Sequence, residues 1–296
     1  MKFKGIIPAV VTPIDANERF LAASFESLLE RLYSAGVDGV YVCGQTGEGL
    51  LQTVEQRKNV AETATRNSPA PKQVIVHVGA YRTEDAVELA RHASRIGAAA
   101  VSALPPLGSY SFEEIRAYYQ EIAAASDVPL LVYYFPEICA AIKSADQILE
   151  LCAIPNVVGL KFTDFDLYRM RCIRQSGSII FNGRDEILAA GLLMGADGGI
   201  GTFYNVVPEL FVDLYSRALQ GDWTGALETQ DRINGVIQIA LRFPAFPAVK
   251  QMLRWSGIDC GECIRPRTGL TPVQTAELRR QLDEYGLELD APVSQA

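Results

Sequence analysis

The sequence lacks an apolar run long enough to cross a membrane. A spanning helix needs at least about 18 consecutive apolar residues, and no stretch of the 296 residues reaches that length. The N-terminal residues lead directly into a strand pattern, without the long apolar region and small-residue cleavage site of a signal peptide. We therefore expect a cytoplasmic protein with no membrane partner.

Positive charge is also scarce. Acidic residues number 35 against 27 lysines and arginines, so the net charge is −8, and the isoelectric point is near 5.0. Such a composition does not favour binding to nucleic acid or to anionic membranes. A site for an anionic substrate would have to gather positive potential locally.

Cysteine and histidine supply no obvious disulfide framework or metal site. The six cysteines are scattered along the chain, which is typical of reduced cytosolic thiols. Cys260 and Cys263 form a CxxC pair, but a zinc site normally needs a second pair of ligands. His77 and His92 are the only histidines and lie far from that pair in sequence. We therefore expect no metal and two incidental thiols.

Short apolar runs alternate regularly with longer helical patterns. Eight runs are predicted strands: Gly5–Val10, Val37–Cys43, Gln73–Val78, Ala98–Ala103, Leu130–Tyr133, Val157–Phe162, Ser178–Phe181 and Gly198–Gly201. The segments between them have helical spacing: Leu21–Ala35, Val54–Asn67, Thr83–Ile96, Phe112–Ser126, Ser144–Ala153, Asp164–Ile173 and Asp185–Met194. Continuous apolar runs such as 130–133 are typical of parallel strands that are covered on both faces.

This alternation predicts an α/β fold, a (β/α)8 TIM barrel. The main alternative is a doubly wound open sheet, whose dinucleotide-binding form carries a glycine-rich fingerprint after the first strand. Residues 11–15 stand at that point and contain no glycine. Four more helical segments follow: Pro208–Gln220, Trp223–Leu241, Ala248–Trp255 and Pro272–Tyr285. We expect residues 1–222 to form the barrel and residues 223–296 a C-terminal helical extension, packed together as a single structural unit.

One lysine differs from the other six. Lys161 lies near the C-terminal end of an apolar strand, where barrels build their active sites and where lysine is rarely buried without a reason. The others, Lys250 among them, lie at the N-terminus, in polar loops, or on helices where the charged head could reach water. Burial would lower the pKa of Lys161, so that its neutral amine could attack a ketone and form a Schiff base. The alternative is a lysine that reaches the barrel rim or pairs with an acid.

Two features near Lys161 support the catalytic interpretation. Tyr133 ends the neighbouring predicted strand, and its hydroxyl could relay protons, although it could also be an ordinary strand aromatic. The loop at residues 43–49 has glycines that permit a sharp turn, so its N–H groups could point at an anion. With the Thr46 hydroxyl, this loop could hold the carboxylate of a 2-oxo acid, or it could be a plain turn. Glu48 could orient the loop or cap the next helix.

Two segments after the last strands are further candidates. Asp185 and Glu186 could accept hydrogen bonds from substrate hydroxyls, but charge placement alone favours ordinary acids at a helix N-terminus. Residues 195–205 cover the eighth strand and its loop, where barrels often bind phosphate. The glycine pattern there is too irregular to establish a phosphate site.

Taken together, these residues resemble the N-acetylneuraminate lyase / dihydrodipicolinate synthase family of class I aldolases. The motifs that carry the resemblance are Gly44-x-Thr46-Gly47-Glu48, Tyr133-x-x-Pro136, Gly159-Leu160-Lys161 and Gly195-Ala196-Asp197-Gly198-Gly199-Ile200-Gly201. The family implies a barrel with a helical extension, usually a homotetramer, and neither metal nor organic cofactor. It also implies individual roles: a Schiff-base lysine at Lys161, a proton relay at Tyr133, and a carboxylate-binding loop at Gly44, Gln45, Thr46 and Gly47.

Within the family, the sequence leans toward the N-acetylneuraminate lyase branch. By that likeness, the polyhydroxylated tail of a sugar acid would meet Gly183, Asp185, Glu186 and Thr202. Thr163 would shape the pocket, and Gly201 would be a further substrate-binding residue. Dihydrodipicolinate synthases typically have an arginine two residues after the proline of Tyr-x-x-Pro, to bind a second carboxylate. This chain has Ile138 there, which argues against aspartate semialdehyde as a substrate.

Some positions depart from the family pattern. Gln45 stands where lyases usually have serine, and Tyr134 occupies the usual asparagine position. Residues 105–110 lack the common tyrosine pair, so we expect Tyr110 to substitute at the substrate site. Thr202 replaces the lyase serine conservatively.

The expected function is a class I aldolase that cleaves or makes a 2-oxo-3-deoxy sugar acid through a pyruvate Schiff base on Lys161. Gln45 and Tyr134 keep other reactions open. These are a dehydratase, deaminase or hydratase-aldolase of another 2-oxo acid, or a condensation of the dihydrodipicolinate synthase type. A non-enzymatic protein that binds a 2-oxo acid is the last alternative.

Overall fold

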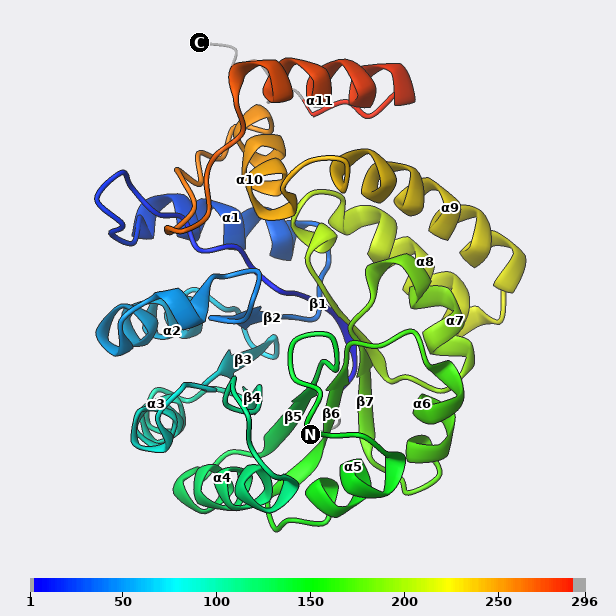
Figure 1. Cartoon of the computed structure of the whole chain (residues 1–296). Coiled ribbons are helices and arrows are strands. Elements are labelled where there is room, and N and C mark those ends of the chain that lie inside the picture. Colours follow the sequence, from blue (N-terminus) through cyan, green and yellow to red (C-terminus); the bar gives the residue numbers. More distant parts are fainter. Residues whose placement is uncertain (1–2, 290–296) are drawn as a thin grey trace.

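A computed structural model of the chain describes residues 3–289, and Figure 1 shows its arrangement. The ends of the two predicted units, residues 1–2 and 290–296, lie outside the described residues. Within residues 3–289 the core is a single sheet of eight strands: β1 (Gly5–Pro8), β2 (Gly39–Val42), β3 (Gln73–His77), β4 (Ala100–Ala103), β5 (Leu130–Tyr134), β6 (Val157–Phe162), β7 (Ile179–Asn182) and β8 (Gly198–Gly201).

The sheet closes on itself. Its strands pair in the order β1-β8-β7-β6-β5-β4-β3-β2, and every pair is parallel. The remaining gap is joined just beyond β1, where Ala9 bridges Tyr41 in parallel and Val10 N–H donates to Tyr41 O at 2.9 Å. The predicted barrel is therefore confirmed, and the open-sheet alternative is wrong.

The helices surround this barrel, as the alternating colours of Figure 1 show. They are α1 (Ala22–Ser34), α2 (Val54–Arg66), α3 (Thr83–Arg95), α4 (Phe112–Ala125), α5 (Ala145–Cys152), α6 (Leu167–Arg174), α7 (Leu188–Leu193) and α8 (Pro208–Gln220). Three short 3₁₀ turns precede helices: η1 (Gly49–Leu51), η2 (Asp185–Ile187) and η3 (Phe203–Asn205). The helix predicted from Asp185 thus begins as a 3₁₀ turn. The one predicted from Asp164 begins only at Leu167, because the Asp166 side chain caps it by accepting from Arg169 N–H at 2.8 Å.

Buried side chains form two layers, one on each face of the strands. The barrel-interior cluster contains Phe3, Ile7, Ala9, Tyr41, Ile75, Ala100, Leu104, Leu131, Tyr133, Phe181 and Ile200. The larger outer layer packs strand residues such as Val132, Tyr134, Leu160 and Phe162 against the helices. Since successive residues of a strand point to opposite faces, the residues that face the barrel interior and those that face the helices are both apolar. This explains why the strands are continuous apolar runs.

Three more helices follow the barrel in the part of the chain that the structure describes: α9 (Trp223–Ala240), α10 (Ala245–Trp255) and α11 (Pro272–Tyr285). Figure 1 shows α9 running beside α8, with α10 and α11 beyond it. Helix α9 contacts α7, α8 and η2, whereas α10 contacts η3, just after β8. The chain therefore returns to the end of the barrel where β8 finishes. No helix within residues 3–289 combines the length and apolarity that crossing a membrane requires.

Candidate active site

Lys161 is buried at the C-terminal end of the barrel. It is the fifth residue of β6 and only 4% exposed. Its Nζ atom lies 4.2 Å from the ring centroid of Tyr133 and 4.7 Å from that of Tyr41, and both rings belong to the barrel-interior cluster. The ladder between β5 and β6 pairs Tyr133 directly with Lys161. The strand order predicted this neighbour, and the register makes it adjacent.

Burial changes the protonation of Lys161. It lowers the pKa of the side chain from an ordinary 10.5 to about 7, and the negative charge of Asp185 offsets only part of that effect. An ammonium group loses its hydration when buried, which favours the neutral form. A substantial fraction of Lys161 is therefore a free amine near neutral pH, as nucleophilic attack requires.

Tyr133 is held rigidly beside the lysine. Its ring stacks on Phe135, with centroids 6.0 Å apart and planes inclined by 19°, and it meets the His77 ring edge-on at 6.0 Å. Burial raises the pKa of its hydroxyl well above the ordinary value, and the nearby Thr163 hydroxyl opposes this only in part. Tyr133 is therefore a protonated donor at neutral pH, able to give a proton and take it back.

The loop after β2 reaches the loop after β8. The hydroxyls of Thr46 and Thr202 are 2.7 Å apart, which places both beside the cavity. Side chains outside the loop at residues 43–49 hold its backbone in place. Gly47 O accepts from Thr12 Oγ1 at 2.7 Å and from Gln52 Nε2 at 2.6 Å. The N–H groups of Glu48 and Gly49 donate to carbonyls within the loop. These two donors are therefore engaged and do not point at a ligand.

Asp185 faces the cavity from η2. It is 6% exposed, and its Oδ2 accepts from Phe203 N–H at 2.7 Å. Burial raises its pKa from 3.8 to about 7, despite the opposing effects of that hydrogen bond and of Lys161. A Cβ on Gly201 would lie 1.9 Å from Asp185 Oδ1, so the carboxylate fits only because residue 201 is glycine. Asp185 is therefore buried at the cavity wall, whereas an acid that only caps a helix N-terminus would be exposed to solvent.

Glu48 anchors the loop after β2 to the C-terminal helices. Its side chain is fully buried, 3.0 Å from Lys250 Nζ on α10, and accepts from Ile264 N–H at 2.8 Å. Arg267 adds a second cation at 3.6 Å. Glu48 therefore orients the loop, and Thr53 is the residue that caps α2. The expectation that Lys250 reaches water was wrong, because its partner lies about 200 residues earlier in sequence.

Replacing Lys250 with methionine should destabilise the protein strongly. Removing one partner of a buried ion pair leaves an uncompensated buried charge and typically costs about 3–5 kcal/mol of unfolding free energy. Urea unfolding followed by fluorescence would measure the loss. The double variant with Glu48→Gln removes both charges while keeping an acceptor for Ile264 N–H, and it should recover part of the stability. If the two losses simply add, the pair is not coupled as the distances indicate.

A cavity of about 160 Å³ joins these groups. Ten predicted site residues line it: Gln45, Thr46, Tyr133, Lys161, Thr163, Gly183, Asp185, Glu186, Gly201 and Thr202. Three predicted residues do not. Gly44 packs against the Tyr41 ring, Gly47 is turned toward Val10 and Thr12, and Tyr110 packs against Gly108 on the surface, 39% exposed. Tyr110 therefore does not line this cavity, and its role at the substrate site stays a prediction.

Five lining residues were not predicted: Phe135, Arg184, Ile200, Phe203 and Phe246. Four of them lie within or next to segments that the sequence had marked. Phe246 is different, because it comes from α10 and no local pattern connects it with the barrel. Arg267 stacks on its ring at 4.8 Å, which ties Phe246 to the same contacts that bury Glu48.

Tyr134 points away from the cavity. Its ring belongs to the outer layer, and its hydroxyl contacts Arg169 and donates to Asp164 Oδ2 at 3.3 Å. The departure from the family asparagine at this position therefore alters the contact between β5 and α6. Gln45 is the departure that remains at the cavity wall.

The CxxC pair lies apart from the cavity. Cys260 and Cys263 are both buried, and burial raises the pKa of each thiol to about 12. Thiols of this kind are protonated at neutral pH and are poor ligands and nucleophiles. Within residues 3–289, no three histidine, cysteine or acidic side chains gather in a way that could hold a metal ion.

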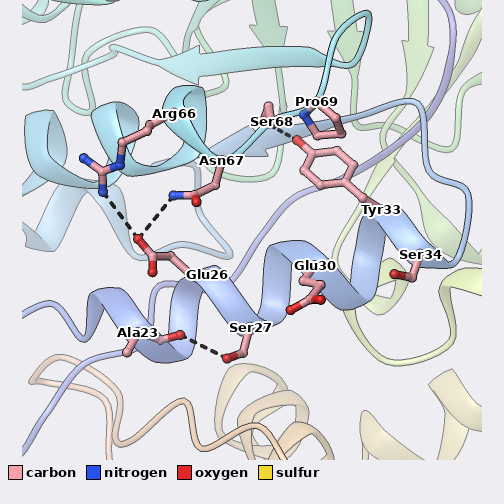
Figure 2. Close-up of a pocket in the computed structure, with 10 residues that line it drawn as sticks. All are labelled: Ala23, Glu26, Ser27, Glu30, Tyr33, Ser34, Arg66, Asn67, Ser68 and Pro69. Carbon is pink, nitrogen blue, oxygen red and sulfur yellow. Dashed lines mark hydrogen bonds and ion pairs between the residues drawn. The ribbon is translucent and has the colours of Figure 1, made fainter.

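A larger groove of about 880 Å³ lies elsewhere, between α1 and the end of α2. Figure 2 shows Glu26 of α1 accepting hydrogen bonds from Arg66 and Asn67 at the end of α2. None of the predicted site residues lines this groove. The chemistry that the sequence predicts is concentrated in the smaller cavity around Lys161.

Comparisons with known proteins agree with this geometry. The model of the "Dihydrodipicolinate synthetase family" matches residues 2–285. An N-acetylneuraminate lyase of Rhizobium meliloti is 35% identical over 282 residues, covering 94% of each chain. An N-acetylneuraminate lyase of Escherichia coli is 35% identical, with 86% of this chain and 87% of that protein covered.

Solved structures show the same fold without separating the branches of the family. The Ruminococcus gnavus sialic acid aldolase superposes with a TM-score of 0.92 at 29% identity, covering 97% of this chain and 98% of that one. A dihydrodipicolinate synthase superposes with a TM-score of 0.90 at 26% identity, covering 96% and 99%. Since the family model spans nearly the whole chain and the named relatives match along most of both lengths, this chain is a member of the dihydrodipicolinate synthetase family and an enzyme of the class I aldolase type, a carbon–carbon lyase.

Proposed function

We propose that this enzyme cleaves a 2-oxo-3-deoxy sugar acid to pyruvate and an aldehyde through a Schiff base on Lys161, in the manner of N-acetylneuraminate lyases. The observation that carries the proposal is a buried lysine with a pKa of about 7, paired in register with Tyr133 at the carboxyl end of the barrel. The homotetramer common in this family is part of the same proposal.

The chemistry follows from these two side chains. The neutral Lys161 amine attacks the C2 ketone, and Tyr133 supplies the proton with which the carbinolamine loses water to form an iminium. The iminium withdraws electrons, so the C3–C4 bond breaks as the C4 hydroxyl passes its proton to the Tyr133 oxygen, which was left deprotonated by the loss of water. The electron pair stays on C3 as an enamine, and C4 leaves as the aldehyde. Protonation at C3 and hydrolysis then release pyruvate and free Lys161.

Other lining residues have positions that suit binding. Thr46 holds the C1 carboxylate while C2 lies at Lys161. Because the Thr202 hydroxyl contacts that of Thr46, we move Thr202 from the tail, where the family resemblance placed it, to this carboxylate. Asp185, Glu186 and Thr163 line the part of the cavity into which the hydroxylated tail would extend. A Cβ on Gly183 would lie 2.0 Å from the Thr163 hydroxyl. Glycine at 183 therefore lets the Thr163 hydroxyl lie against the backbone of the β7 loop.

A second candidate function is a dehydratase, deaminase or hydratase-aldolase of another 2-oxo acid. It is favoured by Gln45, whose amide stands at the cavity wall in place of a hydroxyl. Such reactions would use the same imine, so Lys161 does not separate the two candidates.

Borohydride reduction in the presence of pyruvate tests the proposal. It should add the mass of a reduced pyruvate adduct to the peptide that contains Lys161. A panel of 2-oxo-3-deoxy sugar acids, N-acetylneuraminate included, is then assayed for pyruvate release. An unmodified Lys161 would overturn the Schiff-base function, whereas trapping without pyruvate release from any sugar acid would favour the second candidate.

Imine formation should depend on pH with a midpoint near the pKa of Lys161. The rate of trapping with pyruvate should rise between about pH 6 and 8, because only the neutral amine attacks. Asp185→Asn removes the charge that raises this pKa but keeps an oxygen for Phe203 N–H, so the midpoint should move to lower pH. Stopped-flow or quenched trapping across the pH range measures this. A midpoint that moves upward would contradict the assigned coupling.

A further inference from the structure

Arg184 is, together with Lys161, one of the two basic side chains that line the cavity within the described chain. It immediately precedes η2, between Gly183 and Asp185. Its guanidinium carbon lies 5.2 Å from the ring centroid of Phe135 and 4.4 Å from that of Phe165. Stacking against aromatic faces holds the flat group in place without using its N–H donors.

The donors of Arg184 are only partly used. A guanidinium has five N–H groups in a fixed fork. One terminal nitrogen pairs with Glu137, while the Nε atom is buried and has no hydrogen-bond partner among residues 3–289. The Arg184 side chain is 14% exposed, but that of Glu137 is 59% exposed. A carboxylate so well solvated gains little from the pair, so another carboxylate could take its place.

The other charged residues of the cavity have roles at other parts of the substrate, so Arg184 is available to bind its far end. In the proposed reaction, Lys161 becomes the imine at C2, and the Thr46–Thr202 contact lies at the C1 carboxylate. Asp185 and Glu186 are acidic and suit hydroxyl groups. Among the described residues, Arg184 is then the one basic side chain of the cavity lining that is free to bind a negative charge on the substrate tail. Its pair with Glu137 shows that the guanidinium can bind a carboxylate at this position.

We propose, on the basis of the function proposed above, that Arg184 selects 2-oxo acids with a second carboxylate at the end remote from C1. This carboxylate replaces Glu137 on the guanidinium. The substrate class is then a dicarboxylic, aldaric-type 2-oxo-3-deoxy acid, and a tail of hydroxyl groups alone leaves Arg184 with Glu137. Ile138 removes the family arginine from the β5 loop, whereas Arg184 provides a cation from the segment after β7 and reaches the same β5 loop at Glu137.

Unsubstituted 2-oxo acids test this without depending on sugar stereochemistry or on bond cleavage. The probes are 2-oxoglutarate, 2-oxoadipate and 2-oxopimelate, each compared with the monocarboxylic acid of equal length. Borohydride trapping on Lys161 gives the concentration for half-modification. For at least one length, the wild-type protein should need roughly ten- to 100-fold less diacid than monoacid, the scale of a charge-assisted hydrogen bond. Arg184→Met should abolish most of this preference.

Two further variants test whether Arg184 binds the substrate carboxylate or only holds the β5 loop through Glu137. Glu137→Gln removes the competing carboxylate, so half-modification by the diacid should need a few-fold less of it. Arg116→Met removes an exposed guanidinium that is paired with Glu113 on α4, and it should leave both kinds of probe unchanged. If Arg184 only latches the loop, then Arg184→Met and Glu137→Gln will both weaken diacid and monoacid equally.

The failures of the two proposals look different. If pyruvate itself is not trapped on Lys161, the Schiff-base function is wrong. If pyruvate is trapped but the wild-type protein shows no diacid preference at any length, or Arg184→Met keeps that preference, the assignment of Arg184 is overturned while the aldolase function stands.

Discussion

Lys161→Met should lower kcat by about 10⁴-fold or more, the scale that follows removal of a covalent nucleophile. Methionine fills a similar apolar volume but has no nitrogen to attack the ketone. Since Lys161 is 4% exposed and lies against the rings of Tyr41 and Tyr133, an uncharged side chain should be tolerated there. The thermal midpoint should therefore stay the same or rise. Pyruvate release and intact-protein mass after borohydride reduction measure the two consequences.

A matched control tests whether the loss of activity is specific to Lys161 or follows the loss of any lysine. Lys143 is exposed, at the surface between β5 and α5, and Lys143→Met removes the same functional group. This variant should keep both turnover and trapping. A pyruvate adduct that persists in Lys161→Met would show that another amine carries the imine, and the mechanism would have to be moved to that residue.

Tyr133→Phe should lower kcat by about 10²- to 10⁴-fold, the usual contribution of a positioned general acid–base group. The change keeps the ring under Lys161 and its stacking on Phe135, so KM should change far less than kcat. Steady-state pyruvate release gives both constants. A variant with raised KM and unchanged kcat would indicate that the hydroxyl only binds substrate.

Tyr41 provides the comparison for Tyr133. Its ring also lies under Lys161, at 4.7 Å, but its hydroxyl donates to Ser102 Oγ at 3.2 Å. Tyr41→Phe therefore tests the loss of a tyrosine hydroxyl that is engaged in the barrel interior. We expect a loss below about tenfold, because no proton transfer is assigned to it. Equal losses in the two variants would mean that general packing, not proton relay, explains the effect.

The fold could be predicted from local patterns. Eight apolar runs alternated with helical spacing, and all eight became strands within a few residues of their expected bounds. The pattern is local because residues on both faces of a parallel strand must be apolar when helices cover the sheet. Lys161 was visible for the same reason, since one charged residue interrupted an otherwise apolar strand.

Errors and omissions concern contacts between distant segments. Lys250 reads as an ordinary helix-surface lysine until Glu48 is placed 3.0 Å away. The family pattern predicts that Tyr134 lies near the substrate, but strand alternation turns its side chain outward to Arg169. Phe246 had no signal at all, because α10 reaches the cavity only after the chain passes along α9.

The sequence alone determined the barrel, the buried lysine on its sixth strand and the tyrosine on its fifth. These follow from periodicity and from the rule that parallel strands end at one rim. The family resemblance already placed Asp185 and Glu186 at the site, and only the tertiary structure decided which aromatic rings and which second cation share the cavity with Lys161. Burial and charge at that rim depend on loops from opposite sides of the barrel, and no local pattern specifies how closely Asp185, Arg184 and Phe246 approach.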